Sequence, residues 1–291
     1  MRRLKTGCLF ALLFVMTLVV ALTGFMVVEA RRAPQGTPVY VALGSSFAAG
    51  AGLGSLQHGS PLLCARSING YPQQLARMLK LSIVDMSCGG ATVTHLLKGG
   101  QFFQGPQLRA IDERTKLVTI TVGGNDVGYI GDLSMLAARN SSTLFGWFVR
   151  RVWSGPRREN ERGYVHLQEQ LTAAVRTIHA RAPKATIVLA TYPTILPPEG
   201  TCSRLGLSAA EVMMMREVAG QLALITKSAA NQTGAKLVDM QVLGAAHHAC
   251  SADPWTKGWT NGGIAPFHPN LEGAAATAKA IAEALRGHQQ L

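Results

Sequence analysis

The sequence predicts an α/β domain in which a parallel sheet lies between layers of helices. Short apolar runs alternate along the chain with amphipathic segments of helical periodicity, which is the pattern of the units that build parallel sheets. The chain has 291 residues, and 47% of them are hydrophobic. It is therefore long enough for one large domain and too apolar to be disordered.

The elements follow one another in a regular order. Residues 37–43 form an apolar run that ends at Gly44 and predicts the first strand. Helical periodicity follows over residues 71–81, and a short strand is expected over residues 82–86. Residues 117–122 are apolar and β-branched, which is typical of a strand buried on both faces of a sheet.

The second half of the chain continues the alternation. Residues 164–181 predict a helix, and residues 186–191 predict another buried strand. Residues 208–231 are expected to form a long amphipathic helix, with the serine at its first position as the cap. Residues 236–239 supply a last strand and residues 270–285 a closing helix.

The N-terminus differs in composition from the rest. Three basic residues within the first five positions precede an almost unbroken apolar run over residues 8–28. Residues 1–30 are therefore either a signal peptide, cleaved after a small residue, or an N-terminal membrane anchor. Residues 31–36 are expected to be a linker and residues 37–291 the folded domain. Both alternatives export the domain, either secreted or membrane-anchored on the extracytoplasmic side.

The protein is strongly basic. Its formal net charge is +12. The first thirty residues carry three basic side chains and one glutamate, so a net charge of +10 remains on the domain. This charge favours anionic partners such as phospholipid or acidic glycan surfaces, although it also suits simple solubility. The basic residues are scattered and the domain is exported, so we expect no nucleic-acid partner.

Five cysteines are present, and Cys8 lies within the N-terminal apolar run. The other four are Cys64, Cys88, Cys202 and Cys250. An even number of cysteines in an exported protein predicts two disulfides. Three pairings are compatible with the sequence. We favour Cys64–Cys88 and Cys202–Cys250, because each pair brackets a segment that must be positioned around the candidate site.

Polar turns that contain glycine follow three of the expected strands. They lie at residues 44–46, 87–90 and 123–126. Ligands of open parallel sheets bind beyond the carboxyl ends of the strands, so these turns are expected to converge on one site.

Four residues near these turns and near the C-terminus suit acyl-transfer chemistry. Ser46 lies on a tight strand-to-helix turn that exposes its hydroxyl. His268, between two prolines, is a candidate base of near-neutral pKa. The N–H groups of Ser46 and Gly90 and the side-chain amide of Asn125 are candidate donors to an oxyanion. Taken singly, each of these residues also suits a structural role in a turn.

Together these residues resemble the SGNH hydrolases, also called the GDSL family, and particularly the disulfide-containing secreted esterases and lipases among them. The resemblance extends from about Val39 to Leu285 and includes the segments 64–72 and 106–108. The four short blocks that carry it are Gly44-Ser45-Ser46-Phe47-Ala48-Ala49-Gly50, Ser87-Cys88-Gly89-Gly90-Ala91-Thr92, Val122-Gly123-Gly124-Asn125-Asp126 and Phe267-His268-Pro269-Asn270.

The resemblance implies a flavodoxin-like parallel sheet in a three-layer α/β/α sandwich. It also implies that Ser46 is the nucleophile and His268 the base. Ser46, Gly90 and Asn125 would form the oxyanion hole. The implied reaction uses no metal and no cofactor.

Two positions depart from the family pattern. Ser45 replaces the aspartate that usually precedes the nucleophile, and Ala265 stands where the acid of the triad is expected. We expect the backbone carbonyl of Ala265 to hold the imidazole in place of that acid, with Asp253 as a more distant alternative. Without a carboxylate, the chemistry is expected to be slower.

The sequence thus predicts a monomeric serine esterase or lipase that acts on small-molecule or lipid esters. Two alternatives are a polysaccharide O-acetylesterase and a non-catalytic surface binding protein with the same fold. Residues 143–158 combine large apolar side chains with four arginines. They are expected to form either a lid or membrane-surface element, or a helix packed on the sheet with a solvated basic edge.

Overall fold

The computed structural model describes residues 2–31 and 36–286, so most of the predicted linker, residues 31–36, lies outside the described residues. Parallel strands form the central sheet: β1 (Tyr40–Gly44), β2 (Ile83–Asp85), β3 (Leu117–Thr121), β4 (Thr186–Ala190) and β5 (Lys236–Val238). They lie in the order β2-β1-β3-β4-β5. Val41 of β1 lies in register with Val84 of β2 and Val118 of β3.

Side chains alternate between the two faces of this sheet, and each face has its own helices. Helices α3 (Tyr71–Leu79) and α10 (Leu271–Arg286) cover one face, where they bury Tyr40 and Val188. The other face buries Val41 and Ile120. It is covered by α4 (Val93–Leu97), α5 (Tyr129–Asn140), α7 (Tyr164–Arg181) and α8 (Ala209–Thr233). The α/β/α sandwich expected from the sequence is confirmed.

The helices expected from periodicity are present, and Ser208 caps α8 by accepting a hydrogen bond from the N–H of Glu211. Helix α5, which begins just after the turn at residues 123–126, was not predicted from the sequence. The strand-to-helix turn expected at Ser46 leads into the short helix α2 (Ser46–Ala49). Other elements are too short for helical periodicity to reveal, namely α4, α9 (Met240–Leu243), η1 (Leu62–Cys64), η2 (Gln101–Phe103), η3 (Gln107–Ala110) and η4 (Glu159–Glu161).

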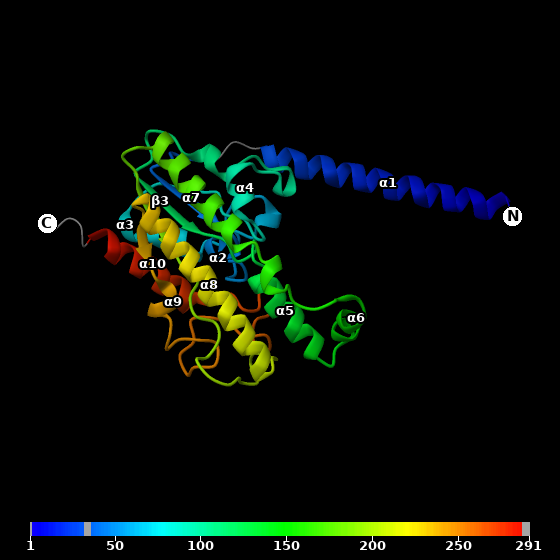
Figure 1. Ribbon diagram of the computed structural model, residues 1–291. Helices are drawn as coiled ribbons and strands as arrows, with labels where there is room; N and C mark the ends of the chain where they lie inside the picture. The colour runs from blue at the N-terminus through cyan, green and yellow to red at the C-terminus, as the bar shows by residue number, and fades with distance from the viewer. Residues whose placement is uncertain (1, 32–35, 287–291) are drawn as a thin grey trace.

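Two helices project from the body of the domain, both toward the right in Figure 1. Helix α1 (Arg2–Arg31) includes an apolar stretch, Leu12–Ala30, that is long enough to cross a membrane and is not buried in the domain. Helix α6 (Leu144–Val152) packs on α5 and exposes most of its apolar side chains. The disulfides Cys64–Cys88 and Cys202–Cys250 are both present, in the pairing that the sequence analysis favoured.

A buried ion pair fixes the start of α5. Arg162 Nη1 lies 2.9 Å from Asp132 Oδ2, and both side chains are almost fully buried. The guanidinium of Arg162 also donates to the carbonyl of Val127, two residues beyond Asn125. Arg162 therefore holds both the first turn of α5 and the chain just after the turn at residues 123–126.

We predict that Arg162→Met lowers the free energy of unfolding by about 3 kcal/mol, because Asp132 then stays buried without its cation. Urea unfolding followed by tryptophan fluorescence measures this change. The control is Arg158→Met, which removes a solvent-exposed pair with Glu161 and should leave the midpoint almost unchanged. Equal midpoints for the two variants would contradict the prediction.

Candidate active site

The turn that follows β1 places Ser46 at the first position of α2. Gly44, the last residue of β1, has φ +141°, and a Cβ on it would lie 2.3 Å from the carbonyl oxygen of Thr121. Only glycine therefore lets β1 approach β3 this closely before the chain turns. The Ser45 N–H donates to the same Thr121 carbonyl, which fixes the direction in which Ser46 leaves the sheet.

Ser46 and His268 are in direct contact. The distance between Ser46 Oγ and His268 Nε2 is 2.7 Å. On the other side of the ring, His268 Nδ1 lies 2.8 Å from the carbonyl oxygen of Pro266. A carbonyl can only accept, so Nδ1 carries the proton and Nε2 is left free to accept from the serine hydroxyl.

The prediction that the Ala265 carbonyl holds the imidazole was wrong by one residue, because Pro266 supplies that carbonyl. Phe267 adopts a left-handed conformation with φ +59°, which turns the chain sharply between Pro266 and His268. The carbonyl two residues before the histidine thereby reaches its own ring. A positive φ at a phenylalanine is uncommon and could not be foreseen from the sequence.

The environment of His268 favours its neutral form. The imidazole is buried, and this burial lowers the pKa of His268 to about 4. The nearby ammonium of Lys257 contributes to this lowering, while the hydrogen bond to Pro266 opposes it. Asp253, the more distant alternative for a triad acid, instead contacts the imidazole of His247.

Gly90 and Asn125 come from two different turns that are joined to each other by hydrogen bonds. Asn125 Nδ2 donates to the carbonyl of Ala91 at 2.9 Å, next to Gly90. Asp126 accepts from the N–H of Val93, and burial raises the pKa of this carboxyl to about 6. An amide nitrogen carries two hydrogens, so Asn125 retains a second donor after binding Ala91. The turns at residues 87–90 and 123–126 are thus held together, as the sequence analysis expected.

Comparison with known proteins decides the family. Residues 42–276 match the model of the GDSL-like Lipase/Acylhydrolase family. The chain belongs to this family. "Lipase 2" of Streptomyces coelicolor is 32% identical, and the match covers 90% of this chain and 94% of that protein.

Two crystal structures agree with this assignment. The structure of an extracellular lipase from Streptomyces rimosus superimposes with a TM-score of 0.67 at 27% identity, covering 84% of this chain and 98% of that one. The structure of phospholipase A1 from Streptomyces albidoflavus gives a TM-score of 0.65 at 26% identity, with the same coverage of both chains. This GDSL-like acylhydrolase is a carboxylic ester hydrolase of the lipase and esterase class. Its apolar N-terminal helix and its disulfides indicate an exported protein.

Several residues that support the site had no assigned role in the sequence analysis. Gln107 binds Gly44 with both ends of its amide: Oε1 accepts from the Gly44 N–H at 2.9 Å, and Nε2 donates to the Gly44 carbonyl at 3.0 Å. Gln107 therefore fixes the residue from which the serine turn departs. In the sequence, the segment 106–108 was notable only as part of the family resemblance, because Gln107 and Gly44 lie 63 residues apart in the chain.

Tyr192 is the second support that the sequence analysis missed. Its hydroxyl lies 3.0 Å from Ser45 Oγ and accepts from the N–H of Gly124 at 3.1 Å, so it joins the serine turn to the turn that carries Asn125. Burial raises the pKa of Tyr192 to about 12, which keeps the phenol protonated. Its place just after β4, at the same sheet edge as the other turns, was the signal that could have identified it.

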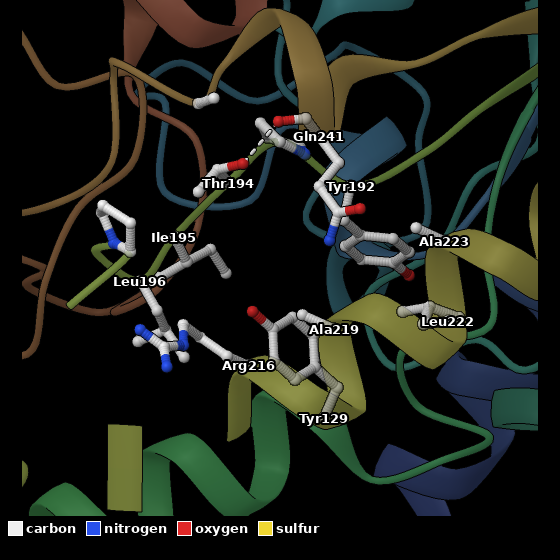
Figure 2. Close-up of a pocket in the computed structure, with 13 residues that line it drawn as sticks. Tyr129, Tyr192, Thr194, Ile195, Leu196, Arg216, Ala219, Leu222, Ala223 and Gln241 are labelled. Atoms are coloured by element: carbon white, nitrogen blue, oxygen red, sulfur yellow. Dashed lines mark hydrogen bonds between the residues drawn. The ribbon is translucent and has the colours of Figure 1, made fainter. Parts of the chain in front are cut away.

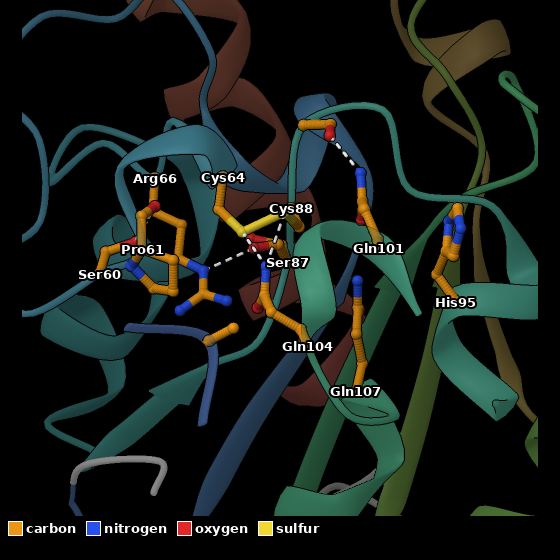
Figure 3. The surroundings of a disulfide bond; sticks show 12 residues. Ser60, Pro61, Cys64, Arg66, Ser87, Cys88, His95, Gln101, Gln104 and Gln107 are labelled. Atoms are coloured by element: carbon orange, nitrogen blue, oxygen red, sulfur yellow. Dashed lines mark hydrogen bonds between the residues drawn. A yellow bond between two sulfur atoms is a disulfide. The ribbon is translucent and has the colours of Figure 1, made fainter. Parts of the chain in front are cut away.

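The turn that contains Gly90 is anchored from its other side by the first disulfide. Figure 3 shows Cys64 and Cys88 beside Gln104, whose Nε2 lies 3.0 Å from Cys64 Sγ. Gln101 Nε2 donates to the carbonyl of Gly89 at 2.6 Å. Both η1, through the disulfide of Cys64, and η2, through Gln101, therefore fix the chain next to Gly90.

A largely apolar cavity of about 200 Å³ lies behind Tyr192, and its lining residues include neither Ser46 nor His268. Figure 2 shows Tyr192 and Tyr129 on its walls, with Leu222 of α8 and Arg216 beside them. The phenol of Tyr192 contacts Ser45, next to the nucleophile candidate, so this ring forms part of the boundary between the cavity and the serine turn.

We predict that Gln107→Leu reduces kcat for a soluble p-nitrophenyl ester about 10- to 100-fold, because the serine turn loses both hydrogen bonds that fix Gly44. Steady-state kinetics measures the effect, and circular dichroism checks the fold. Gln232→Leu, at an exposed position on α8, is the matched control and should keep the parent kcat. An unchanged kcat in Gln107→Leu would show that the clamp on Gly44 is dispensable.

Proposed function

We propose that this GDSL-like acylhydrolase hydrolyses lipid esters by a two-step acyl transfer, with Ser46 as nucleophile and His268 as general base. The 2.7 Å contact between Ser46 Oγ and His268 Nε2 is the observation that carries the assignment. A hydroxyl is a weak nucleophile until a base within hydrogen-bond distance accepts its proton.

In the first step, Ser46 Oγ attacks the ester carbonyl while His268 Nε2 takes the hydroxyl proton. The N–H groups of Ser46 and Gly90 and the amide of Asn125 stabilise the oxyanion of the tetrahedral intermediate. The C–O bond then breaks, and the alcohol leaves with the proton from His268. Water attacks the acyl-serine with His268 as base, which releases the acid and restores Ser46. These steps use only groups of the chain and water.

The Pro266 carbonyl orients the ring in this scheme but contributes less than a carboxylate. Its hydrogen bond fixes the tautomer with the proton on Nδ1, as the acid of a triad does. A neutral acceptor stabilises the imidazolium of the transition state less than an anion would. The proposed dyad is therefore slower than a full triad, but it retains the positioning of the base and the oxyanion donors.

Three observations favour lipid esters over short acyl esters as substrates. One relative of known structure is a phospholipase A1. The cavity behind Tyr192, whose hydroxyl contacts Ser45, is largely apolar. Helix α6 carries exposed aromatic residues that suit a lipid surface. A polysaccharide O-acetylesterase would instead prefer acetyl esters, so a profile of rate against acyl-chain length distinguishes the two. We further propose that residues 1–30 tether the monomeric enzyme to the outer face of a membrane.

We predict that Ser46→Ala abolishes hydrolysis of p-nitrophenyl esters and labelling by a fluorophosphonate probe, because both need the activated hydroxyl. Peptide mapping of the labelled parent protein should place the probe on Ser46. Ser228→Ala, on α8, is the control and should label like the parent. Retained labelling in Ser46→Ala would refute the assigned nucleophile.

The pH profile of kcat/KM should have an unusually low acid limb. Only the neutral imidazole is a base, and burial lowers the pKa of His268 to about 4. Activity on a soluble ester should therefore persist as pH falls through about 6.5, the ordinary range of histidine, and decline near pH 4.

Lys257→Met should move this acid limb to higher pH, because loss of a nearby cation favours the imidazolium. Lys279→Met removes an exposed cation on α10 and should leave the profile in place. An acid limb near pH 6.5 in the parent protein would contradict the assignment of buried His268 as the base.

A further inference from the structure

Large apolar side chains are exposed on two segments that flank the site. The first patch consists of Leu62, Leu63, Phe102 and Phe103, on η1 and η2. The second patch consists of Leu144, Phe145, Trp147, Phe148 and Val152, on α6. Leu144 is 87% exposed and Trp147 is 50% exposed. Such a concentration of apolar surface on a folded protein marks an interaction site.

The first patch is joined to the proposed oxyanion hole. Leu63 precedes Cys64, whose disulfide partner Cys88 lies two residues before Gly90. Phe102 follows Gln101, which binds the carbonyl of Gly89. Phe102 and Phe103 both have positive φ values, 47° and 62°. Two successive phenylalanines in this conformation with exposed rings are costly for the fold, and such strain is typical of functional segments.

The second patch is joined to the other side of the oxyanion hole. Helix α6 rests on α5, which begins shortly after Asn125. Gly146 permits this close packing, because a Cβ there would lie 2.4 Å from the carbonyl oxygen of Ala138 on α5. With Gly146 and Val149 buried against the domain, the remaining apolar side chains of α6 face outward. In Figure 1, α1 and α6 extend toward the same side of the domain.

Helix α1 runs along the first patch. A groove of about 180 Å³ lies between Leu22 and Phe25 of α1 and Leu62 and Phe102 of the patch. Arg109 Nη2 donates to the carbonyl of Ala30, at the end of the membrane-length stretch Leu12–Ala30. When this stretch spans a bilayer, its end lies at the bilayer surface, and the first patch lies there with it.

We propose that the two patches form one docking face for an anionic phospholipid bilayer, so that the mouth of the site opens at the lipid surface. This inference rests on the proposed lipid-ester function and extends it by naming the surface that presents the substrate. Continuity of the first patch with α1 identifies a bilayer as the occupant. Residues of α1 enter the membrane where the patch begins, and the patch side chains follow them into its interfacial layer.

The charge of α6 fits the same occupant. The helix contains Arg150 and Arg151 and no acidic residue. The guanidinium of Arg151 lies 4.4 Å from the ring centroid of Trp147. Tryptophan and arginine are the side chains favoured at the interface between lipid headgroups and acyl chains. The net positive charge of the domain adds attraction to anionic headgroups.

Fluorescence quenching tests whether α6 enters the bilayer. The full chain is reconstituted into vesicles of phosphatidylcholine and phosphatidylglycerol, with or without bromine on the acyl chains. Bromolipid should quench the protein's tryptophan fluorescence, and Trp147→Phe should lose most of the quenched component. Trp255→Phe removes a tryptophan stacked on His247 away from the face and should keep that component. Absence of quenching in the parent protein overturns the proposal.

Hydrolysis of vesicle phospholipid tests whether the face presents the substrate. Phe102→Asn with Phe103→Asn is one double variant, because asparagine accepts positive φ most readily and so preserves the turn. Trp147→Gln with Phe148→Gln is the other. Each should lower the rate on vesicle lipid about tenfold or more and keep the rate on a soluble acetyl ester. The control Val242→Ser with Leu243→Ser alters two exposed apolar residues on α9 and should keep both rates.

The outcomes separate this inference from the proposed function. Parent-like rates on vesicle lipid in both face variants overturn the docking face while leaving the esterase assignment intact. Failure of the parent protein to hydrolyse any ester overturns the proposed function itself. If the face binds a second copy of the chain instead, light scattering in detergent shows a dimer that the face variants abolish, and the bilayer proposal is overturned.

Discussion

The hydrogen bond between Ser46 Oγ and His268 Nε2 joins positions 222 residues apart, and each partner is held by its own backbone constraint. Ser46 is placed by the close approach of Gly44 to Thr121 and by the clamp of Gln107 on Gly44. His268 is placed by the left-handed turn at Phe267, which returns the Pro266 carbonyl to the ring. The side chains therefore meet because the backbone on either side has little freedom, as a preorganised site requires.

The surroundings of position 265 differ from those of a triad acid. Position 265, where the family places a carboxylate, holds an alanine packed closely against Gly52: a Cβ on Gly52 would lie 2.6 Å from Ala265 Cβ and 2.9 Å from Lys257 Nζ. This corner of the site is crowded and contains a cation. Burial and Lys257 both favour the neutral imidazole, so the local electrostatics keep the base ready to accept a proton but give little support to the imidazolium that follows.

The part of the site that follows strand ends was predictable from the sequence. An apolar run that ends in a glycine-bearing turn fixes both the strand and the edge at which its loop emerges, which is why the turns with Ser46, Gly90 and Asn125 were expected to converge. Contacts made by single side chains over long sequence distances were not predictable. The clamp of Gln107 on Gly44 depends on tertiary packing. The choice of the Pro266 carbonyl, rather than that of Ala265, as the partner of His268 depends on a single dihedral angle at Phe267.

Attachment to a membrane through the proposed docking face would compensate for the slow chemistry of a Ser-His dyad. Because the oxyanion turn is tied through Cys88 to Cys64 and through Gly89 to Gln101, contacts at the exposed side chains of η1 and η2 act on a segment rigidly linked to the reacting atoms. An enzyme held against a bilayer meets lipid esters at a high local concentration, since association becomes effectively intramolecular. When the enzyme is held at the bilayer, capture of substrate from solution no longer limits the rate, so a site whose acyl-transfer step is slow still hydrolyses lipid effectively.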